Sequence, residues 1–199
     1  MHAFNYHKAT SVADAAAKFA ASDEARLLAG GQTLIAAMKM RLSAPADVID
    51  LGGIAELRGI KVDGGSISIG AMTTHAAVAA SKEIAKAIPA LAALAASIGD
   101  PMVRNMGTIG GSVANNDPAA DYPAAVLGLD ATVITSKRKI AADRFFTGMY
   151  ETALEPGEII TSLSFPIPKR ASYMKFKNPA SRYAMVGVFV ADTGAGIRV

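Results

Sequence analysis

Two short glycine-bearing segments, about eighty residues apart, contain the residue types most suited to binding a ligand. One is Ala29-Gly30-Gly31-Gln32-Thr33, and the other is Gly107-Thr108-Ile109-Gly110-Gly111-Ser112. Each is expected to form a tight loop leading from an apolar stretch toward a helix. Glycine lets the backbone approach a ligand closely and lets neighbouring N–H groups converge on an anion. Either segment alone is more often an ordinary turn, but the pair predicts a ligand with two linked phosphates.

The second segment continues into a polar stretch that a hydrophobic core does not require. Asn115, Asn116 and Asp117 follow it, and Asp121 lies just beyond them. Taken alone, the first three are typical turn residues and Asp121 is a typical N-cap of the next helix. Their amide and carboxylate groups, beside the hydroxyls and glycines of the loop, suit a polyhydroxylated, phosphorylated ligand.

The first fifty residues predict the element that positions the first glycine segment. Ser11 and Asp14 have the spacing of a capping box and open an alanine-rich helix. A short strand over residues 26–29 leads into the loop, a helix follows from Leu34 until Pro45 stops it, and residues 48–51 form a buried strand. These elements make a β-α-β unit whose turn carries the glycines.

The residues after Gly53 predict an antiparallel or mixed sheet with helices. Asp63-Gly64-Gly65 marks a hairpin between residues 59–62 and 66–70. Helices are expected over 74–80, 82–87 and 89–98 and from Asp121 onward, and strands over 131–136 and 158–165. Lys137-Arg138-Lys139 is expected to be a solvated hairpin turn.

The last thirty residues predict strands at 173–177 and 186–191, followed by a turn into Ile197-Arg198-Val199. A final strand of three residues leaves its partner mostly unpaired, which is a liability for an exposed edge. We therefore expect a further domain to begin near Ala171 and to be incomplete within this sequence.

Composition excludes several classes of function. At 199 residues and 51% apolar content, the chain can bury a sizeable core. Its net charge is +3, but the basic residues are scattered among acidic ones and aromatics are few, so a nucleic-acid partner is not expected. No apolar run is long enough to span a membrane, and no signal peptide is visible. With no cysteine, this chain has no disulfide and no cysteine-ligated iron–sulfur cluster, and the cytoplasm is the expected compartment.

Three segments resemble the signature motifs of the FAD-binding (medium) subunit of molybdenum hydroxylases: residues 29–35, 104–112 and 117–121. That family includes aerobic carbon monoxide dehydrogenases and the xanthine dehydrogenases built from separate subunits. The likeness runs in order to about Pro168. It implies an α+β fold of the vanillyl-alcohol-oxidase (PCMH) type, with one subdomain at residues 1–55 and a second at 56–170. Residues 171–199 would begin a truncated C-terminal α+β domain.

The resemblance also implies which residues surround FAD: Ala29, Gly30, Gly31, Gln32, Thr33, Thr108, Ile109, Gly110, Gly111, Ser112, Asp121 and Tyr183. The first loop would hold the pyrophosphate through backbone amides, and the second would hold it from the other side. Asp121 would bind ribityl or ribose hydroxyls, Ile109 would lie near the isoalloxazine, and Tyr183 would lie against the ring. Lys175 and Lys177 would be near the flavin edge, although alternate lysines of a strand more often face solvent.

The same resemblance assigns the other cofactors to partners. The 2Fe-2S clusters would lie on an iron–sulfur small subunit and the molybdenum cofactor on a large subunit, and FAD would pass electrons to NAD⁺ or a quinone. The flavin then performs the redox chemistry, so no catalytic side chain and no metal ligand are expected in this chain. His2, His7 and His75 lie outside the motifs and are expected to be surface or capping residues.

Two alternatives remain open from the sequence. One is a free-standing FAD-dependent oxidase or reductase of the same fold, although no cysteine, and no histidine in a glycine loop, is present to attach the flavin. The other is a nucleotide-binding module without redox activity, although neither a P-loop nor a Rossmann glycine pattern occurs. The substrate of a complex, whether carbon monoxide, a purine or an aromatic heterocycle, does not follow from this chain.

Overall fold

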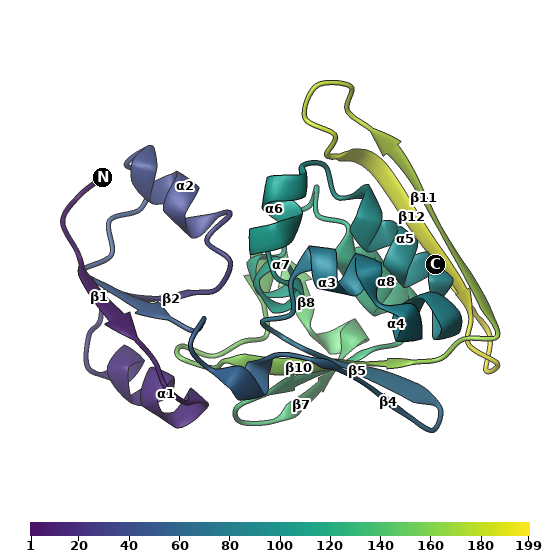
Figure 1. Cartoon of the computed structure of the whole chain (residues 1–199), viewed down its shortest axis with the longest axis horizontal. Helices are drawn as coiled ribbons and strands as arrows, with labels where there is room; N and C mark the ends of the chain where they lie inside the picture. Colours follow the sequence, from purple (N-terminus) through teal and green to yellow (C-terminus); the bar gives the residue numbers. More distant parts are fainter.

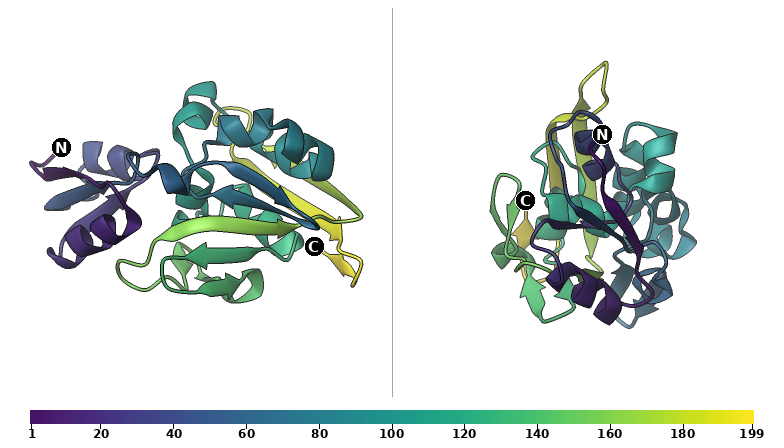
Figure 2. Two further views of the ribbon diagram at one scale, coloured as in Figure 1. Left: turned by 60° about the horizontal axis from the view of Figure 1, so that its bottom comes forward. Right: turned by 90° about the vertical axis from the view of Figure 1, so that its left-hand side faces the viewer.

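The computed structural model describes residues 1–199, which form two units with a hairpin on the far side of the second (Figure 1). The first unit has a three-stranded parallel sheet in the order β1-β3-β2. Helices α1 and α2 lie on opposite faces of this sheet (Figures 1 and 2). The elements are β1 (Asn5–Lys8), α1 (Val12–Ala20), β2 (Ala25–Leu28), α2 (Leu34–Lys39) and β3 (Asp47–Asp50).

The predicted β-α-β unit is confirmed, because β2 and β3 are parallel neighbours joined through α2. The predicted start of α1 is also confirmed, since the Ser11 hydroxyl accepts a 3.0 Å hydrogen bond from the Asp14 amide. The helix α2 is shorter than predicted. It stops at Lys39 because Arg41 takes a left-handed conformation (φ 61°), and the Leu42 amide bonds back to the Ala37 carbonyl at 2.9 Å, which closes the helix.

The second unit is built on a five-stranded antiparallel sheet in the order β4-β5-β10-β6-β7, with helices α3 to α8 over one face (Figure 1). Its strands are β4 (Ile60–Asp63), β5 (Ser66–Gly70), β6 (Thr132–Thr135), β7 (Lys139–Ala141), β8 (Phe146–Gly148), β9 (Glu151–Thr152) and β10 (Ile160–Pro166), of which β8 and β9 pair separately. Its helices are η1 (Ala55–Leu57), α3 (His75–Ala80), α4 (Lys82–Ala87), α5 (Pro89–Ser97), α6 (Pro101–Met106), α7 (Ile109–Asn115), α8 (Tyr122–Gly128) and η2 (Ala142–Arg144).

Most elements of this unit match the sequence prediction. The hairpin at Asp63-Gly64-Gly65 is confirmed, since Asp63 pairs with Ser66 across the turn. The hairpin predicted at residues 137–139 is confirmed, although Lys139 is already the first residue of β7 and pairs with Ile134. The short helix α6, which leads into the second glycine segment, was not predicted.

The C-terminal hairpin packs against the side of the helical layer that faces away from the sheet. It comprises β11 (Arg170–Lys177) and β12 (Ala184–Asp192), and β13 (Ile197–Arg198) adds two further pairs. Phe189 is buried in the large core, and a side chain on Gly128 of α8 would meet the Phe189 ring at 2.9 Å. The outer face of the hairpin exposes Met174 and Phe176. The predicted strands are therefore confirmed, and the hairpin is held by its inner face.

Each unit has a core of its own, and three residues of the second unit, Leu57, Met72 and Ile159, belong to the core of the first. The smaller core consists of nine buried residues and includes Met72 and Ile159, which come from the segments after β5 and before β10. The larger core of 27 residues lies between the five-stranded sheet and the helices. These side chains of the second unit pack in the core of the first unit and so connect the two units. None of the helices has the length and apolar character needed to cross a bilayer.

Candidate functional site

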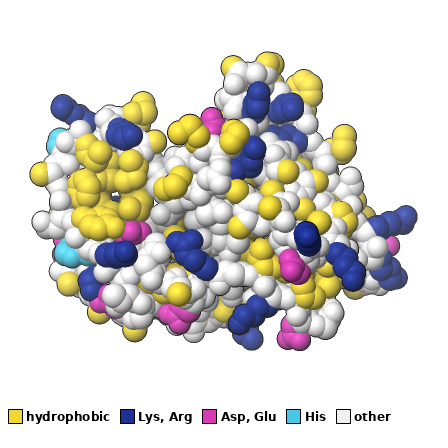
Figure 3. Space-filling model, viewed as in Figure 1, with side chains coloured by type: hydrophobic (Ala, Val, Ile, Leu, Met, Phe, Trp, Pro, Cys, Tyr) yellow, Lys and Arg dark blue, Asp and Glu magenta, His cyan; other side chains and the backbone are white.

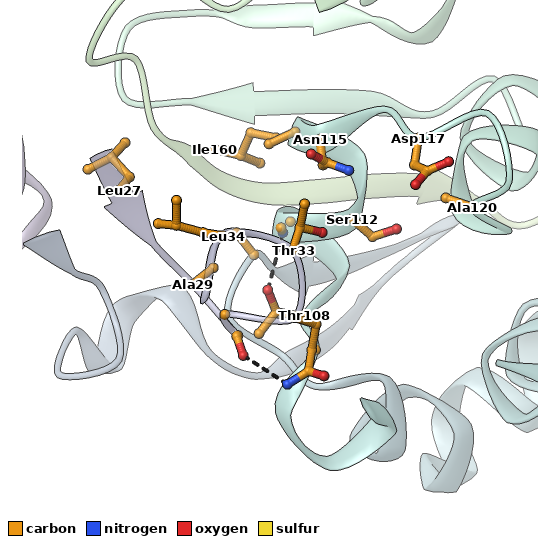
Figure 4. Close-up of a pocket in the computed structure, with 18 of the residues that line it drawn as sticks. Leu27, Ala29, Thr33, Leu34, Thr108, Ser112, Asn115, Asp117, Ala120 and Ile160 are labelled. Atoms are coloured by element: carbon orange, nitrogen blue, oxygen red, sulfur yellow. Dashed lines mark hydrogen bonds between the residues drawn. The ribbon is translucent and has the colours of Figure 1, made fainter. Parts of the chain in front are cut away.

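A cavity of about 540 Å³ lies between the two units and is lined by both glycine segments. Its size falls within the range of small-molecule and cofactor sites. Figure 4 shows residues of the first loop, such as Ala29 and Thr33, near Thr108 and Ser112 at the beginning of α7. No cluster of His, Cys, Asp or Glu is arranged there or elsewhere to hold a metal ion.

The structure brings the two glycine segments into direct contact. A Cβ atom on Gly30 would lie 2.7 Å from the Cα of Gly107, and one on Gly111 would lie 3.3 Å from the Cβ of Ala29. Gly30 is therefore needed because it packs against the backbone of the second segment, and Gly111 packs closely against the Ala29 side chain. This contact places the loops on one ligand-sized cavity.

The first loop presents a row of unused backbone donors. No protein acceptor bonds to the N–H groups of Gly30, Gly31, Gln32 or Thr33. Gly31 has a positive φ of 73°, which turns the chain within this row. Successive free N–H groups in a turn of this kind form a concave anion site. The first loop therefore has the free backbone donors that the predicted phosphate-binding loop requires.

The second glycine segment differs from the prediction in two ways: residues 109–112 form the first turn of α7 and not a loop, and several of its amides already donate within the protein. Those of Ile109 and Gly110 donate to the carbonyls of Thr73 and Ala71 at 3.0 and 2.9 Å. The Gly111 amide donates to the Thr108 hydroxyl, which caps α7, at 3.2 Å. The segment therefore reaches the cavity through side chains such as Ser112 and not through these amides.

All but one of the predicted cofactor-binding residues line the cavity. The lining residues among them are Ala29, Gly30, Gly31, Gln32, Thr33, Thr108, Gly110, Gly111, Ser112, Asp121 and Tyr183. Ile109, expected near an isoalloxazine, is fully buried in the large core and does not line the cavity. It is the first residue of α7, and its side chain points away from the cavity into the packed layer.

The cavity has an apolar end and a polar end, as Figure 4 shows. Leu27, Leu34 and Ile160 gather at one end, and Ser112, Asn115 and Asp117 lie toward the other. Sequence reasoning treated Asn115 as a turn residue. In the structure it ends α7, and its side chain has no hydrogen-bond partner within the protein. An amide of this kind is available to a ligand.

Asp121 is not the side-chain N-cap that its position suggested. Its carboxylate makes no cap bond to α8 and instead accepts a hydrogen bond from the Tyr173 hydroxyl at 2.5 Å. The Lys175 ammonium lies 2.9 Å from Asp121 Oδ1 and 3.1 Å from Oδ2. Burial first and this hydrogen bond second raise the pKa of Tyr173. Lys175, expected to face solvent, is only 7% exposed because its strand packs over α5, whereas Lys177 is exposed.

His75 is likewise not a surface residue. It is 6% exposed, lines the cavity, and has no partner for Nδ1. Its backbone N–H donates to the Gly107 carbonyl at 3.0 Å, and a Cβ on Gly107 would lie 2.6 Å from His75 Nε2. The imidazole therefore packs directly against Gly107 in the second glycine segment. Burial lowers the pKa of His75 to about 4, so the ring is neutral at pH 7.

Glu158 also lines the cavity. Its side chain is fully buried, and Arg138 donates to both of its carboxylate oxygens, from Nε at 3.1 Å and from Nη2 at 3.0 Å. The Thr135 hydroxyl adds a 2.6 Å bond. Arg138 above all lowers the pKa of Glu158 to about 2. The predicted solvated turn thus includes one arginine with a structural role.

The fold is that of the FAD-binding medium subunit of carbon monoxide dehydrogenase. Against the reconstituted carbon monoxide dehydrogenase from Oligotropha carboxidovorans, the TM-score is 0.91 at 39% identity, over 96% of this chain and 69% of that one. Quinoline 2-oxidoreductase from Pseudomonas putida 86 gives a TM-score of 0.91 at 33% identity, over 96% and 68%.

The chain belongs to the family described as the FAD binding domain in molybdopterin dehydrogenase, whose model matches residues 2–168. The carbon monoxide dehydrogenase medium chain of Afipia carboxidovorans is 40% identical over 97% of this chain and 70% of that protein. The nicotine 6-hydroxylase medium subunit of Paenarthrobacter nicotinovorans is 35% identical over 99% and 71%. The predicted resemblance is therefore confirmed, and the relatives are subunits of oxidoreductases.

Proposed function

We propose that this chain binds FAD in the cavity between its two units and acts as the electron outlet of a molybdenum hydroxylase complex. The observation that carries the proposal is the row of free backbone N–H groups at residues 30–33, facing the second loop across a cavity of about 540 Å³. A bound FAD supplies the redox chemistry, and the chain supplies position and electrostatics.

The lining residues support one orientation of FAD. The free amides of the first loop, with the Ser112 hydroxyl opposite, suit the pyrophosphate. Leu27, Leu34 and Ile160 would enclose the adenine, since an apolar slot favours a flat aromatic base. The ribityl chain would then pass Asp121 toward the rim, where Tyr183 would lie against the flavin ring.

The partners follow from what the chain lacks and from its relatives. The sequence has no cysteine to ligate an iron–sulfur cluster, and two similar chains are named medium chain or medium subunit. Electrons would pass from molybdenum on a large subunit, through 2Fe-2S clusters on a small subunit, to FAD and then to NAD⁺ or a quinone.

The chain is proposed to contain three units, at residues 1–55, 56–170 and 171–199. Separate sheets for the three segments and separate cores for the first two support this division. Limited proteolysis followed by mass spectrometry of the fragments tests it, because cleavage should concentrate near residues 55 and 170.

The direct test of the function is flavin binding followed by reduction. The purified chain is mixed with FAD, separated from free FAD, and its spectrum is recorded before and after dithionite. Bound flavin absorption that bleaches on reduction is expected. A chain that retains no flavin at micromolar concentration would contradict the proposal. Co-purification from the native host with a cysteine-rich subunit and a molybdenum-containing subunit tests the complex separately.

A further inference from the structure

A buried ion pair joins the cavity wall to the C-terminal hairpin. Asp121 lines the cavity and is 6% exposed, and Lys175, which does not line the cavity, lies behind it on β11. Tyr173 on the same strand donates to the same carboxylate. Both hairpin residues lie beyond residues 2–168, the part that matches the family model.

The hydrogen-bond capacity of these groups is almost completely used. The three donors of the Lys175 ammonium face Asp121 Oδ1, Asp121 Oδ2 and, at 3.4 Å, the Ser97 carbonyl. Oδ1 of Asp121 accepts from the Tyr173 hydroxyl and lies 2.9 Å from the Lys175 nitrogen, whereas Oδ2 accepts one hydrogen bond, from Lys175. A carboxylate oxygen offers about two acceptor sites. One acceptor site on Oδ2 is therefore left.

The strand partner of β11 is shaped around this arrangement. A Cβ atom on Gly187 of β12 would lie 2.6 Å from the Tyr173 hydroxyl oxygen. A larger residue at 187 would push the hydroxyl away from Asp121. Asp121 is thus a fixed acceptor that cannot turn toward solvent.

We propose that Lys175 and Tyr173 are positioning residues that hold Asp121 Oδ2 as a hydrogen-bond acceptor for a ribityl hydroxyl of FAD, so that the hairpin β11–β12 completes the polar end of the site. The inference rests on the proposed FAD function. It adds that the strands after residue 168 contribute to cofactor affinity from behind the cavity wall, without touching the cofactor.

The proposed role of Lys175 and Tyr173 predicts different effects on the binding of FAD and of ADP, two ligands that both contain the pyrophosphate. ADP contains the adenosine and pyrophosphate of FAD but lacks the ribityl chain and the flavin ring. A change at Lys175 should therefore weaken FAD binding and leave ADP binding almost unchanged. A merely structural role would weaken both ligands together, because the loops and the apolar end would be disturbed as well.

The experiment measures dissociation constants of FAD and ADP by isothermal titration calorimetry for the wild-type chain, Lys175→Met, Tyr173→Phe and the control Lys177→Met. For Lys175→Met we expect FAD affinity to fall about 10- to 100-fold, as for a charged hydrogen bond lost, and ADP affinity to change less than about twofold. Tyr173→Phe should give a smaller loss in the same direction. Lys177→Met, a lysine exposed at the end of the same strand, should match the wild type.

Loss of the lysine leaves a buried carboxylate unpaired, so the double variant Asp121→Asn/Lys175→Met guards against unfolding. It should fold, bind ADP normally and bind FAD as weakly as Lys175→Met. Unchanged FAD affinity in both Lys175 variants, or a parallel loss of ADP, would overturn the inference while the proposed function stands. A wild-type chain that binds neither ligand would refute the proposed function and the inference with it.

Discussion

Gly30 and Gly107, one from each glycine segment, are in backbone contact: a Cβ on Gly30 would lie 2.7 Å from the Gly107 Cα. This contact aligns a loop with free amides beside a loop whose amides are used. It also explains why neither position has room for a side chain, since His75 fills the corresponding space under Gly107. The geometry of the cavity therefore depends on close approach of two loops far apart in sequence.

Gly30→Ala should weaken FAD binding and lower stability together. The added methyl group forces the loops apart, and overpacking of this kind costs about 1–3 kcal/mol. The measurements are thermal unfolding and FAD titration. Gly65→Ala is the matched control, because a Cβ there would meet nothing within 4 Å and its φ is not positive. An alanine at 30 that leaves both quantities at the control level would contradict the described loop contact.

His75 should make the protein less stable in mild acid. Its pKa of about 4 in the folded chain lies below the usual 6.5, so the unfolded chain binds the proton more readily. Stability is then lost as the pH falls from 6.5 toward 4, by about 2 kcal/mol between pH 7 and pH 5. His75→Leu should flatten this part of the profile, as measured by urea unfolding at both pH values. His2→Leu, at an exposed position, should keep the wild-type slope.

The sequence was sufficient where local chemistry decides the structure. The hairpin at Gly64 and the capped start of α1 depend on neighbouring residues, and both were predicted correctly. The strand β1 was missed because Asn5 to Lys8 are polar and mostly exposed, and the strand exists only through parallel pairing with β3. Pairing of that kind depends on residues forty positions away.

The candidate site also has a part that the sequence predicts and a part that only the structure shows. The Gly-Gly patterns of the two glycine segments are visible in the sequence, so both segments were identified without the structure. The surroundings of His75 and Lys175 are supplied by other segments, and neither residue type nor spacing reveals them. Alternation correctly placed Lys175 on one face of β11, but that face is buried because α5 lies beneath it. Solvent exposure follows from the packing of layers.

Glu158 should stabilise the cavity wall above about pH 4.5 and lose this effect as the pH falls through its lowered pKa of about 2. At pH 7, Glu158→Gln should unfold with roughly 2 kcal/mol less free energy than the wild type, because the ion pair between buried Glu158 and partly exposed Arg138 is lost. The difference should shrink steadily below pH 4.5. Denaturant unfolding at pH 7, 4 and 3 measures it, with exposed Glu24→Gln as the control. A difference that stays constant with pH would assign the effect to packing.

Two adjacent asparagines should respond in opposite ways. Asn115 lines the cavity without a protein partner, whereas Asn116 donates to the carbonyls of Gly148 and Glu151 at 2.8 and 3.0 Å and has a positive φ of 44°. Asn115→Ala should weaken FAD about three- to tenfold and leave the melting temperature unchanged. Asn116→Ala should lower stability by about 1–2 kcal/mol, since two side-chain hydrogen bonds and a residue type that tolerates the left-handed conformation are lost. FAD titration and thermal unfolding of both variants decide the matter, because equal effects on both quantities would mean that Asn115 is a structural residue and not a ligand contact.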